Sequence, residues 1–335
     1  MYLTRRQNWL LYLFSLLLLL VIFYFCGQRP TMNAQLLHNK RILFLGDSIT
    51  QNGMYVSFIE YYLQKQNPTL KFDIISIGLS SETVSGLSEN GRQFPRPNLH
   101  ERLQPALENV KPAIVVACYG MNDGIYNPQS ETRMKAYQDG ILRLINTIKA
   151  TGASVILLTP PPFDPLPIAE KVVADGADNY GYSTPYFHYD SVLSEYSSWL
   201  MSLNIANVYA IDLHTPMNNY VKQQRQQTPN FCFSNDGVHP SAQGHLFMAW
   251  QFLKALQIPL PNQNLPAELS VIEADPLFHL VASHRQLRST GWLKYIGYAL
   301  AETVKSDSIQ EVEKEAADLQ AKIEQMLQAF MTTTK

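Results

Sequence analysis

The chain has 335 residues, of which 46% are hydrophobic and 16% are charged, and its formal net charge is −2 at pH 7. This length allows one or two domains with a sizeable buried core. The charge balance excludes a basic nucleic-acid-binding surface and an acidic solvating tail, so polar recognition would rest on neutral groups, which suit sugars or small esters better than polyanions.

The first patterned segment is an uncharged run from Trp9 to Cys26, which follows Arg5 and Arg6. As a helix it spans roughly 27 Å, about one hydrocarbon core, and it ends in bulky aromatic residues instead of a small-residue cleavage site. We therefore expect a transmembrane signal-anchor over residues 1–27, with the rest of the chain extracytoplasmic, either periplasmic or extracellular. The alternatives are a secreted protein and a lipoprotein acylated at Cys26.

Residues 28–39 are polar, contain Pro30 and are predicted to form a linker. An alternation of short apolar runs and longer periodic segments then predicts an α/β domain over residues 40–260. The predicted strands are 41–45, 72–77, 113–118, 154–159 and 207–213, and the predicted helices are 54–66, 99–109, 131–150, 190–203 and 242–256. This alternation is typical of a five-stranded parallel sheet with helices on both faces.

Ligands of such sheets bind at the carboxyl ends of the strands, so we expect the chemistry just after the apolar runs. Two loops at this edge are unusually long, residues 80–98 and residues 160–188. We expect both loops to shape a substrate cleft, and the alternative is that they are surface insertions.

Residues 261–335 are predicted to form a helical C-terminal extension of two or three helices. The last of these, residues 308–331, has apolar side chains at alternating spacings of three and four. They are Ile309, Val312, Ala316, Leu319, Ile323, Met326 and Phe330. We expect the stripe to pack within the chain, because three heptads are short for the alternative, a homodimeric coiled coil; the oligomeric state stays open.

Three cysteines, Cys26, Cys118 and Cys232, form neither a disulfide framework nor a metal-site spacing. We expect free thiols. A bridge between Cys118 and Cys232 is the alternative if the chain is exported.

A serine, Ser48, directly follows the first predicted strand within the segment GDSIT. A serine between a strand and a helix N-terminus exposes its hydroxyl where the first helical N–H groups face a developing negative charge. Late in the chain, Asp236 and His239 are three residues apart in DGVHP. A serine hydroxyl needs a base to take its proton, and the base needs a third group to hold its tautomer. The three residues therefore predict a catalytic triad.

Acyl transfer also needs donors directed at the tetrahedral oxyanion. Gly78 follows the second predicted strand and can offer its backbone N–H, and Asn122, in GMND after the third strand, can offer its side-chain amide. Each residue alone is more often a turn former. Their occurrence in this order, each after a different strand, favours the catalytic interpretation.

These four segments resemble the four blocks of the SGNH (GDSL-like) hydrolase superfamily, over about Lys40 to Leu256. The blocks are GDSIT for serine, IGLSSET for glycine, GMND for asparagine and DGVHP for Asp and His. The segments ACYGMNDGIY and FPRP also look like a bacterial subgroup associated with carbohydrate esterases. The glycine block departs from the usual N-x-G-x-x-G, because Ser76 and Ser81 stand at its first and last positions.

The resemblance implies a flavodoxin-like three-layer α/β/α fold without a metal or another cofactor. It implies that Ser48 is the nucleophile, and that His239 is the base, oriented by Asp236. The oxyanion hole would consist of the backbone N–H groups of Ser48 and Gly78 and the side chain of Asn122.

The predicted function is hydrolysis of small acyl esters, with acetyl esters of carbohydrate as the first choice, through an acyl-enzyme on Ser48. Candidate substrate-binding residues on or beside the long loops are Arg92, Arg96, Tyr126 and Phe163, and the alternative for each is packing within its loop. The expected partners are an ester or O-acetylated glycan and, through residues 1–27, a membrane, but no nucleic acid. An O-acetyltransferase acting on envelope polysaccharide and a non-catalytic glycan-binding protein are the alternative functions.

Overall fold

The computed structural model describes residues 32–260, 264–297 and 308–333. Its centre is a sheet of five parallel strands in the order β2-β1-β3-β4-β5. The strands are β1 (Arg41–Gly46), β2 (Asp73–Ser76), β3 (Ile114–Cys118), β4 (Ser154–Leu158) and β5 (Val208–Ile211). All five residues of the central strand β3 are buried, as expected for a sheet covered on both faces.

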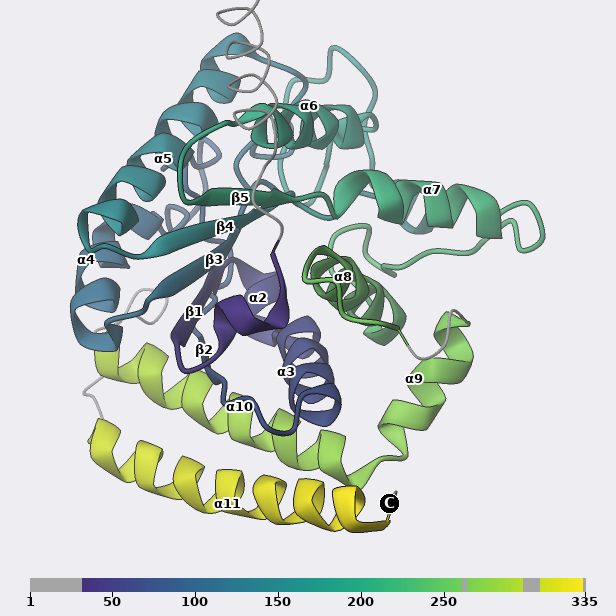
Figure 1. Ribbon diagram of the computed structural model, residues 1–335. Coiled ribbons are helices and arrows are strands. Elements are labelled where there is room, and N and C mark those ends of the chain that lie inside the picture. The colour runs from purple at the N-terminus through teal and green to yellow at the C-terminus, as the bar shows by residue number, and fades with distance from the viewer. Residues whose placement is uncertain (1–31, 261–263, 298–307, 334–335) are drawn as a thin grey trace, which may run out of the picture.

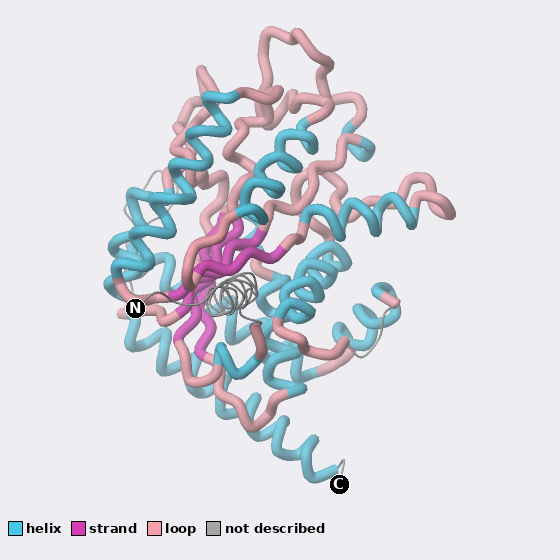
Figure 2. The backbone as a smooth tube through the Cα atoms, turned by 45° about the horizontal axis from the view of Figure 1, so that its top comes forward, coloured by secondary structure: helices cyan, strands magenta, loops and turns pink. Residues whose placement is uncertain are grey.

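Helices cover both faces of this sheet, so the fold has three layers (Figures 1 and 2). One layer contains α2 (Ser48–Asn52), α3 (Met54–Gln66) and α8 (Ala242–Ala255), and the other contains α4 (Leu99–Val110), α5 (Glu131–Ala150) and α6 (Tyr189–Ser202). The predicted α/β fold with a five-stranded parallel sheet is therefore confirmed. The predicted strands and helices of this part agree with the structure to within two residues at each end.

Four short or polar elements of the structure have no counterpart in the prediction. They are the 3-10 helices η1 (Ala34–Leu37) and η2 (Leu166–Ile168), the helix α2, and α7 (His214–Gln224). Met32, Ala34 and Leu37 are buried in the hydrophobic core, so this part of the predicted linker packs against the domain.

The C-terminal region forms α9 (Leu265–Glu273), α10 (Pro276–Ile296) and α11 (Ile309–Thr333). Helix α10 runs along the β2 edge of the sheet and α11 packs on its outer side (Figure 1). Ile309, Ala316 and Ile323 of the predicted stripe are buried, whereas Phe330 is exposed and Leu327 is buried near it. Most of the apolar stripe of α11 therefore packs against the rest of the chain.

The predicted signal-anchor, residues 1–27, lies outside the described residues. In the ranges that are described, no helix combines the length and the apolar character needed to cross a membrane. Cys118 and Cys232 are free thiols, the first buried and the second half-buried, so the alternative of a bridge between them is wrong. Cys26 lies outside the described ranges.

Candidate active site

Ser48 is the first residue of α2, directly after the carboxyl end of β1. The Asp47 carboxylate caps this helix by accepting a hydrogen bond from the Ile49 amide at 2.9 Å. The turn between strand and helix is tight: a Cβ on Gly46 would lie 2.1 Å from Thr50 Oγ1. The strand-to-helix turn thus leaves the Ser48 hydroxyl half-buried at the edge of the sheet.

Ser48, His239 and Asp236 form one hydrogen-bonded series. His239 Nε2 lies 2.8 Å from Ser48 Oγ, and His239 Nδ1 lies 2.6 Å from Asp236 Oδ2. The turn that carries Asp236 and His239 is held by Asp236 Oδ1, which accepts hydrogen bonds from the Ser234 hydroxyl and from the amides of Val238 and His239. Gly237 has φ +76°, and a Cβ there would lie 2.6 Å from the Asp164 carbonyl oxygen, so this turn needs glycine.

The electrostatics of the pair favour a charged Asp236. Partial burial opposes its ionisation, but the hydrogen bonds from His239, Val238 and Ser234 outweigh that effect and lower the pKa of Asp236. The hydrogen bond to Asp236 in turn raises the pKa of His239, against the opposing effect of desolvation. With Asp236 accepting at Nδ1, the neutral imidazole presents a bare Nε2 to the serine hydroxyl.

Two backbone N–H groups at the turn that carries Ser48, those of Gly78 and of Ser48 itself, are candidate oxyanion donors. The amides of Ile77 and Leu79 donate to the carbonyls of Phe44 and Gly46, and the Gly78 amide between them has no partner among the described residues. The Ser48 amide, at the start of α2, also has none there. A Cβ on Gly78 would lie 2.1 Å from Gln51 N and 2.4 Å from Thr50 C, so only glycine lets this strand extension approach α2 so closely.

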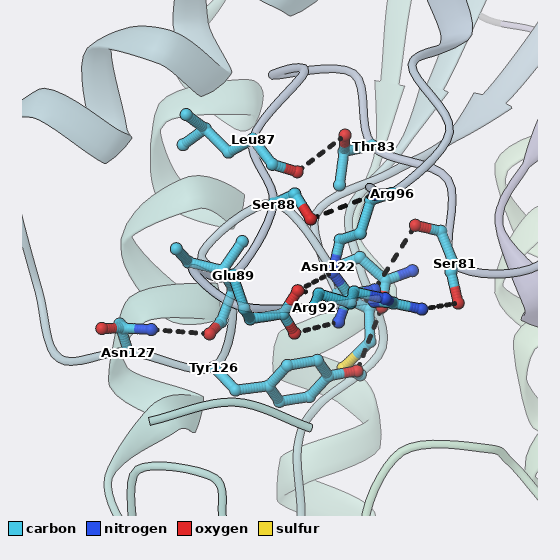
Figure 3. A network of polar contacts seen from close by, with 12 residues as sticks. Ser81, Thr83, Leu87, Ser88, Glu89, Arg92, Arg96, Asn122, Tyr126 and Asn127 are labelled. Atoms are coloured by element: carbon cyan, nitrogen blue, oxygen red, sulfur yellow. Dashed lines mark hydrogen bonds and ion pairs between the residues drawn. The ribbon is translucent and has the colours of Figure 1, made fainter. Parts of the chain in front are cut away.

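Asn122, the third predicted donor, lies on the turn after β3 and is only 4% exposed. Its Oδ1 accepts hydrogen bonds from Arg96 Nη1 at 2.9 Å and from the Tyr126 hydroxyl at 3.1 Å (Figure 3). Its Nδ2 lies 3.4 Å from Asp47 Oδ2 and 3.3 Å from the Glu82 carbonyl oxygen. Burial raises the pKa of the Asp47 carboxyl to about 7, against the hydrogen bond from Ile49.

The triad opens into a cavity of about 560 Å³. Its walls come from the two long loops that the sequence indicated, together with Ser48, His239 and the turn after β3. The lining residues are Ser48, Ser80, Ser81, Glu89, Asn90, Gly91, Arg92, Arg96, Asn122, Tyr126, Gly181, Tyr182, Ser183, Thr184 and His239. Both loops therefore do shape a cleft over the candidate nucleophile.

Three of the four predicted substrate-binding residues, Arg92, Arg96 and Tyr126, line this cavity. Phe163 does not: it is 2% exposed and packs edge-on against Tyr126 and Tyr189, because the proline-rich start of its loop turns into the core. Arg96 is 5% exposed and is held within its own loop by Glu89.

Tyr182 is a site residue that the sequence reasoning missed. It is 49% exposed, and its ring lies edge-on to Tyr126 at 5.6 Å between centroids. Desolvation and the neighbouring Asp236 carboxylate, which its hydroxyl contacts, raise the pKa of Tyr182. No local pattern marks this tyrosine, and the length of the loop from Pro160 to His188 is the only signal that could have led to it. Over the described ranges, no group of three His, Cys, Asp or Glu side chains could hold a metal ion.

The model of the GDSL-like lipase/acylhydrolase family matches residues 44–246 of the chain. A gut microbial diltiazem-metabolizing enzyme of known structure is 21% identical and superposes with a TM-score of 0.49, covering 69% of this chain. The match spans about half of that enzyme's own length, 48%. An acetylxylan esterase from Geobacillus stearothermophilus is 21% identical with a TM-score of 0.46, over 68% of this chain and 98% of the esterase. No curated protein matches the chain in sequence.

Proposed function

This chain belongs to the GDSL-like lipase/acylhydrolase family, a family of carboxylic ester hydrolases, and we propose that it is a serine esterase that removes small acyl groups, acetyl above all, from carbohydrate. The observation that carries the proposal is the hydrogen-bonded series Asp236–His239–Ser48 at the base of an open cavity.

In the first step His239 Nε2 takes the proton of the Ser48 hydroxyl while Ser48 Oγ attacks the ester carbonyl carbon. The carbonyl oxygen becomes an oxyanion, which the amides of Ser48 and Gly78 and the Asn122 Nδ2 group stabilise. His239, held by Asp236, then returns the proton to the leaving alcohol, and the acyl group remains on Ser48 as an ester.

In the second step water enters the site left by the alcohol. His239 takes a proton from this water, whose oxygen attacks the acyl carbon through the same oxyanion arrangement. Collapse of the second tetrahedral intermediate breaks the bond to Ser48 Oγ, which recovers its proton from His239. The products are the alcohol and the carboxylic acid, and the enzyme returns to its starting state.

The cavity lining supports a small acyl group on a polar alcohol. Of its fifteen residues, none has an aliphatic hydrocarbon side chain, and the only large apolar surfaces are the rings of Tyr126 and Tyr182. A long acyl chain would therefore have no apolar wall to pack against. Hydroxyl and amide groups from Ser80, Asn90 and Thr184 could instead hydrogen-bond to sugar hydroxyls, and an exposed ring such as Tyr182 could stack on a pyranose.

The proposal extends to location: the catalytic domain works on the outer side of a membrane, tethered by residues 1–27. This part rests on the sequence alone, on the uncharged run from Trp9 to Cys26 and the two arginines before it.

The test is acetyl release from 4-nitrophenyl acetate and from acetylated xylan by the full-length chain, with Ser48→Ala beside it. We expect release by the wild type and a loss of at least about 10³-fold in Ser48→Ala, because the nucleophile is removed. Equal rates for the two proteins would contradict the serine mechanism. Transfer of acetyl to an added sugar in preference to water would identify the acetyltransferase alternative, and saturable glycan binding without turnover would identify the binding protein.

A further inference from the structure

We infer that Arg96 is a positioning residue that sets the direction of the oxyanion donor Asn122, and that Glu89 holds Arg96 in place for this task. The inference rests on the proposed function, since it requires the Asn122 amide to face a substrate oxyanion. It replaces our expectation that Arg96 binds substrate.

The contacts of Asn122 allow only one orientation of its carboxamide. A guanidinium has donors and no acceptor, so the Asn122 atom that faces Arg96 Nη1 at 2.9 Å must be the oxygen. The Tyr126 hydroxyl donates to the same oxygen at 3.1 Å. A flipped amide would bring its NH₂ group against the guanidinium and leave two buried donors without an acceptor.

This orientation directs Nδ2 toward the Asp47 carboxylate, next to Ser48 in the sequence, and the Glu82 carbonyl. Its two acceptors, Asp47 Oδ2 and the Glu82 carbonyl oxygen, lie at 3.4 and 3.3 Å, longer than an ordinary N–H···O bond. Asp47 directly precedes Ser48, and Asn122 and Ser48 line the same cavity. An oxyanion formed on the substrate can accept a stronger hydrogen bond from Nδ2 than either of these groups does now.

The guanidinium of Arg96 forms hydrogen bonds to protein groups through all three of its nitrogens. Its Nε and Nη2 donate to the two oxygens of the Glu89 carboxylate at 2.8 and 2.6 Å, and its side chain is 1% exposed. Its Nη1 donates hydrogen bonds to Asn122 Oδ1 and to the Ser81 carbonyl oxygen, and its guanidinium lies 5.5 Å from the centre of the Tyr126 ring (Figure 3). Four of its five guanidinium N–H groups are thus directed at protein acceptors, so the protein holds Arg96 in one position.

The loop that carries Arg96 is fastened to the turn that carries Asn122. Within the loop, Thr83 N donates to the Pro97 carbonyl and the Ser88 hydroxyl accepts from Arg96 N. Across to the turn, the buried Asp123 carboxylate accepts the amides of Val84 and Ser85 at 2.8 Å each. Arg96 and Asn122 therefore keep a fixed spacing although they lie far apart in sequence.

Arg92, four residues earlier, offers a natural contrast. Its side chain is 31% exposed, and it donates to Ser81 Oγ at 3.1 Å and to Glu89 at 3.4 Å, so part of its guanidinium faces the open cavity. We therefore expect Arg92 to contact substrate and Arg96 to act through Asn122. Substitution of Arg92 should therefore change mainly KM, and substitution of Arg96 should change mainly kcat.

The experiment is a double-mutant cycle on the full-length chain, with Arg96→Gln, Asn122→Ala and the double variant assayed on 4-nitrophenyl acetate. We expect Arg96→Gln to lower kcat by about 10-fold or more with little change in KM, because a misdirected donor costs transition-state stabilisation. In the Asn122→Ala background the same change should alter kcat by no more than about twofold, because the donor it positions is gone. Arg92→Gln should raise KM for acetylated xylan.

The matched control is Arg288→Gln, since Arg288 is 4% exposed, close to the 5% of Arg96, and is ion-paired with Asp73 and Glu313, but does not line the cavity. We expect it to lower the unfolding temperature without lowering kcat. If Arg96→Gln does not fold, Tyr126→Phe, which removes one donor to Asn122 Oδ1 and keeps the ring, takes its place in the cycle, with an expected kcat loss of about threefold or more.

A kcat loss of equal size in both backgrounds would overturn the inference, because Arg96 would then act independently of Asn122. So would a rise in KM with unchanged kcat. The proposed function fails separately, if the wild type shows no activity that Ser48→Ala removes.

Discussion

At the residue scale, both carboxylate oxygens of Asp236 are held by hydrogen bonds. One of its oxygens accepts three hydrogen bonds, from Ser234, Val238 and His239, and the other accepts from the His239 ring. Although half-burial opposes ionisation, these bonds lower its pKa, so it stays an anion throughout the working pH range. That fixed charge holds the His239 ring in one tautomer and makes it a stronger base.

We predict that Asp236→Asn lowers kcat by about 10³- to 10⁴-fold, because the imidazole loses both its orientation and the charge that stabilises imidazolium. The pKa of His239 is raised by the hydrogen bond to Asp236, and His239 must be neutral to accept a proton. The acidic limb of kcat/KM should therefore lie above the ordinary histidine pKa in the wild type and move to lower pH in Asp236→Asn. Profiles of kcat/KM against pH for both proteins measure this, and an unmoved limb would refute the assignment.

At the same scale, Gly78 illustrates why a small residue stands where an amide is needed. Any Cβ there would overlap the backbone of α2 at Gln51 and Thr50. We predict that Gly78→Ala lowers kcat by about 10²-fold, since the amide and the nucleophile must shift apart. Gly152→Ala is the control, because nothing lies within 4 Å of a Cβ there and Gly152 does not line the cavity; its φ is +85°, so it tests backbone strain without the overlap. Steady-state kinetics with unfolding temperatures compare the two, and equal losses would contradict the steric argument.

At the element scale, α10 and α11 approach each other closely at one point. A Cβ on Gly291 would lie 2.4 Å from Val312 Cγ1, so the absence of a side chain at residue 291 sets the spacing of the two helices. Trp292 of α10 donates a hydrogen bond to Glu313 of α11, and Arg288 of α10 forms an ion pair with the same carboxylate. Both interactions join the two helices beside this contact.

Accordingly, Gly291→Ala should destabilise the protein by about 1–3 kcal/mol through overpacking while kcat stays unchanged, because α11 does not line the catalytic cavity. Val312→Ala in the same chain should recover part of the loss by making room for the added methyl group. Urea unfolding of the two variants and the wild type checks this. Unchanged stability in Gly291→Ala would mean that α11 shifts freely.

At the scale of the whole molecule, α9 and α10 close the sheet edge and the α3 face. Arg288 donates to the Ile74 carbonyl at 2.9 Å and to Asp73 at 2.8 Å, which caps the exposed side of β2. Phe278 stacks on Phe58 at 4.9 Å between ring centroids. The C-terminal helices are thus part of the same hydrophobic core as the sheet.

We therefore predict that a chain ending at residue 260 does not give a soluble, cooperatively unfolding protein, because it exposes the apolar side of α3 and the edge of β2. Supplying residues 261–335 as a separate chain should restore solubility and esterase activity. Size-exclusion chromatography and thermal unfolding of the two preparations decide this. A fully active, monomeric truncation would show that these helices serve something other than the fold.

The sequence by itself determined the sheet, its main helices and the position of Ser48, Asp236, His239, Gly78 and Asn122 in the fold, because these depend on local patterns. Apolar runs mark buried strands, periodic segments mark helices, and parallel strands bring their carboxyl ends to one edge whatever lies between them. The five-residue helix α2 is too short for any periodicity to show, and α7 is too polar.

Only the tertiary structure decided which charged and aromatic side chains touch one another. Arg96 and Asn122 meet because a long loop folds back on the turn after β3, and Tyr182 reaches Asp236 from a loop more than fifty residues earlier. Phe163 and Tyr182 are both aromatic residues of the same long loop. Phe163 is nevertheless buried and packs against Tyr126. Loop residues carry no periodicity, so their partners depend on how the backbone closes, which no local pattern encodes.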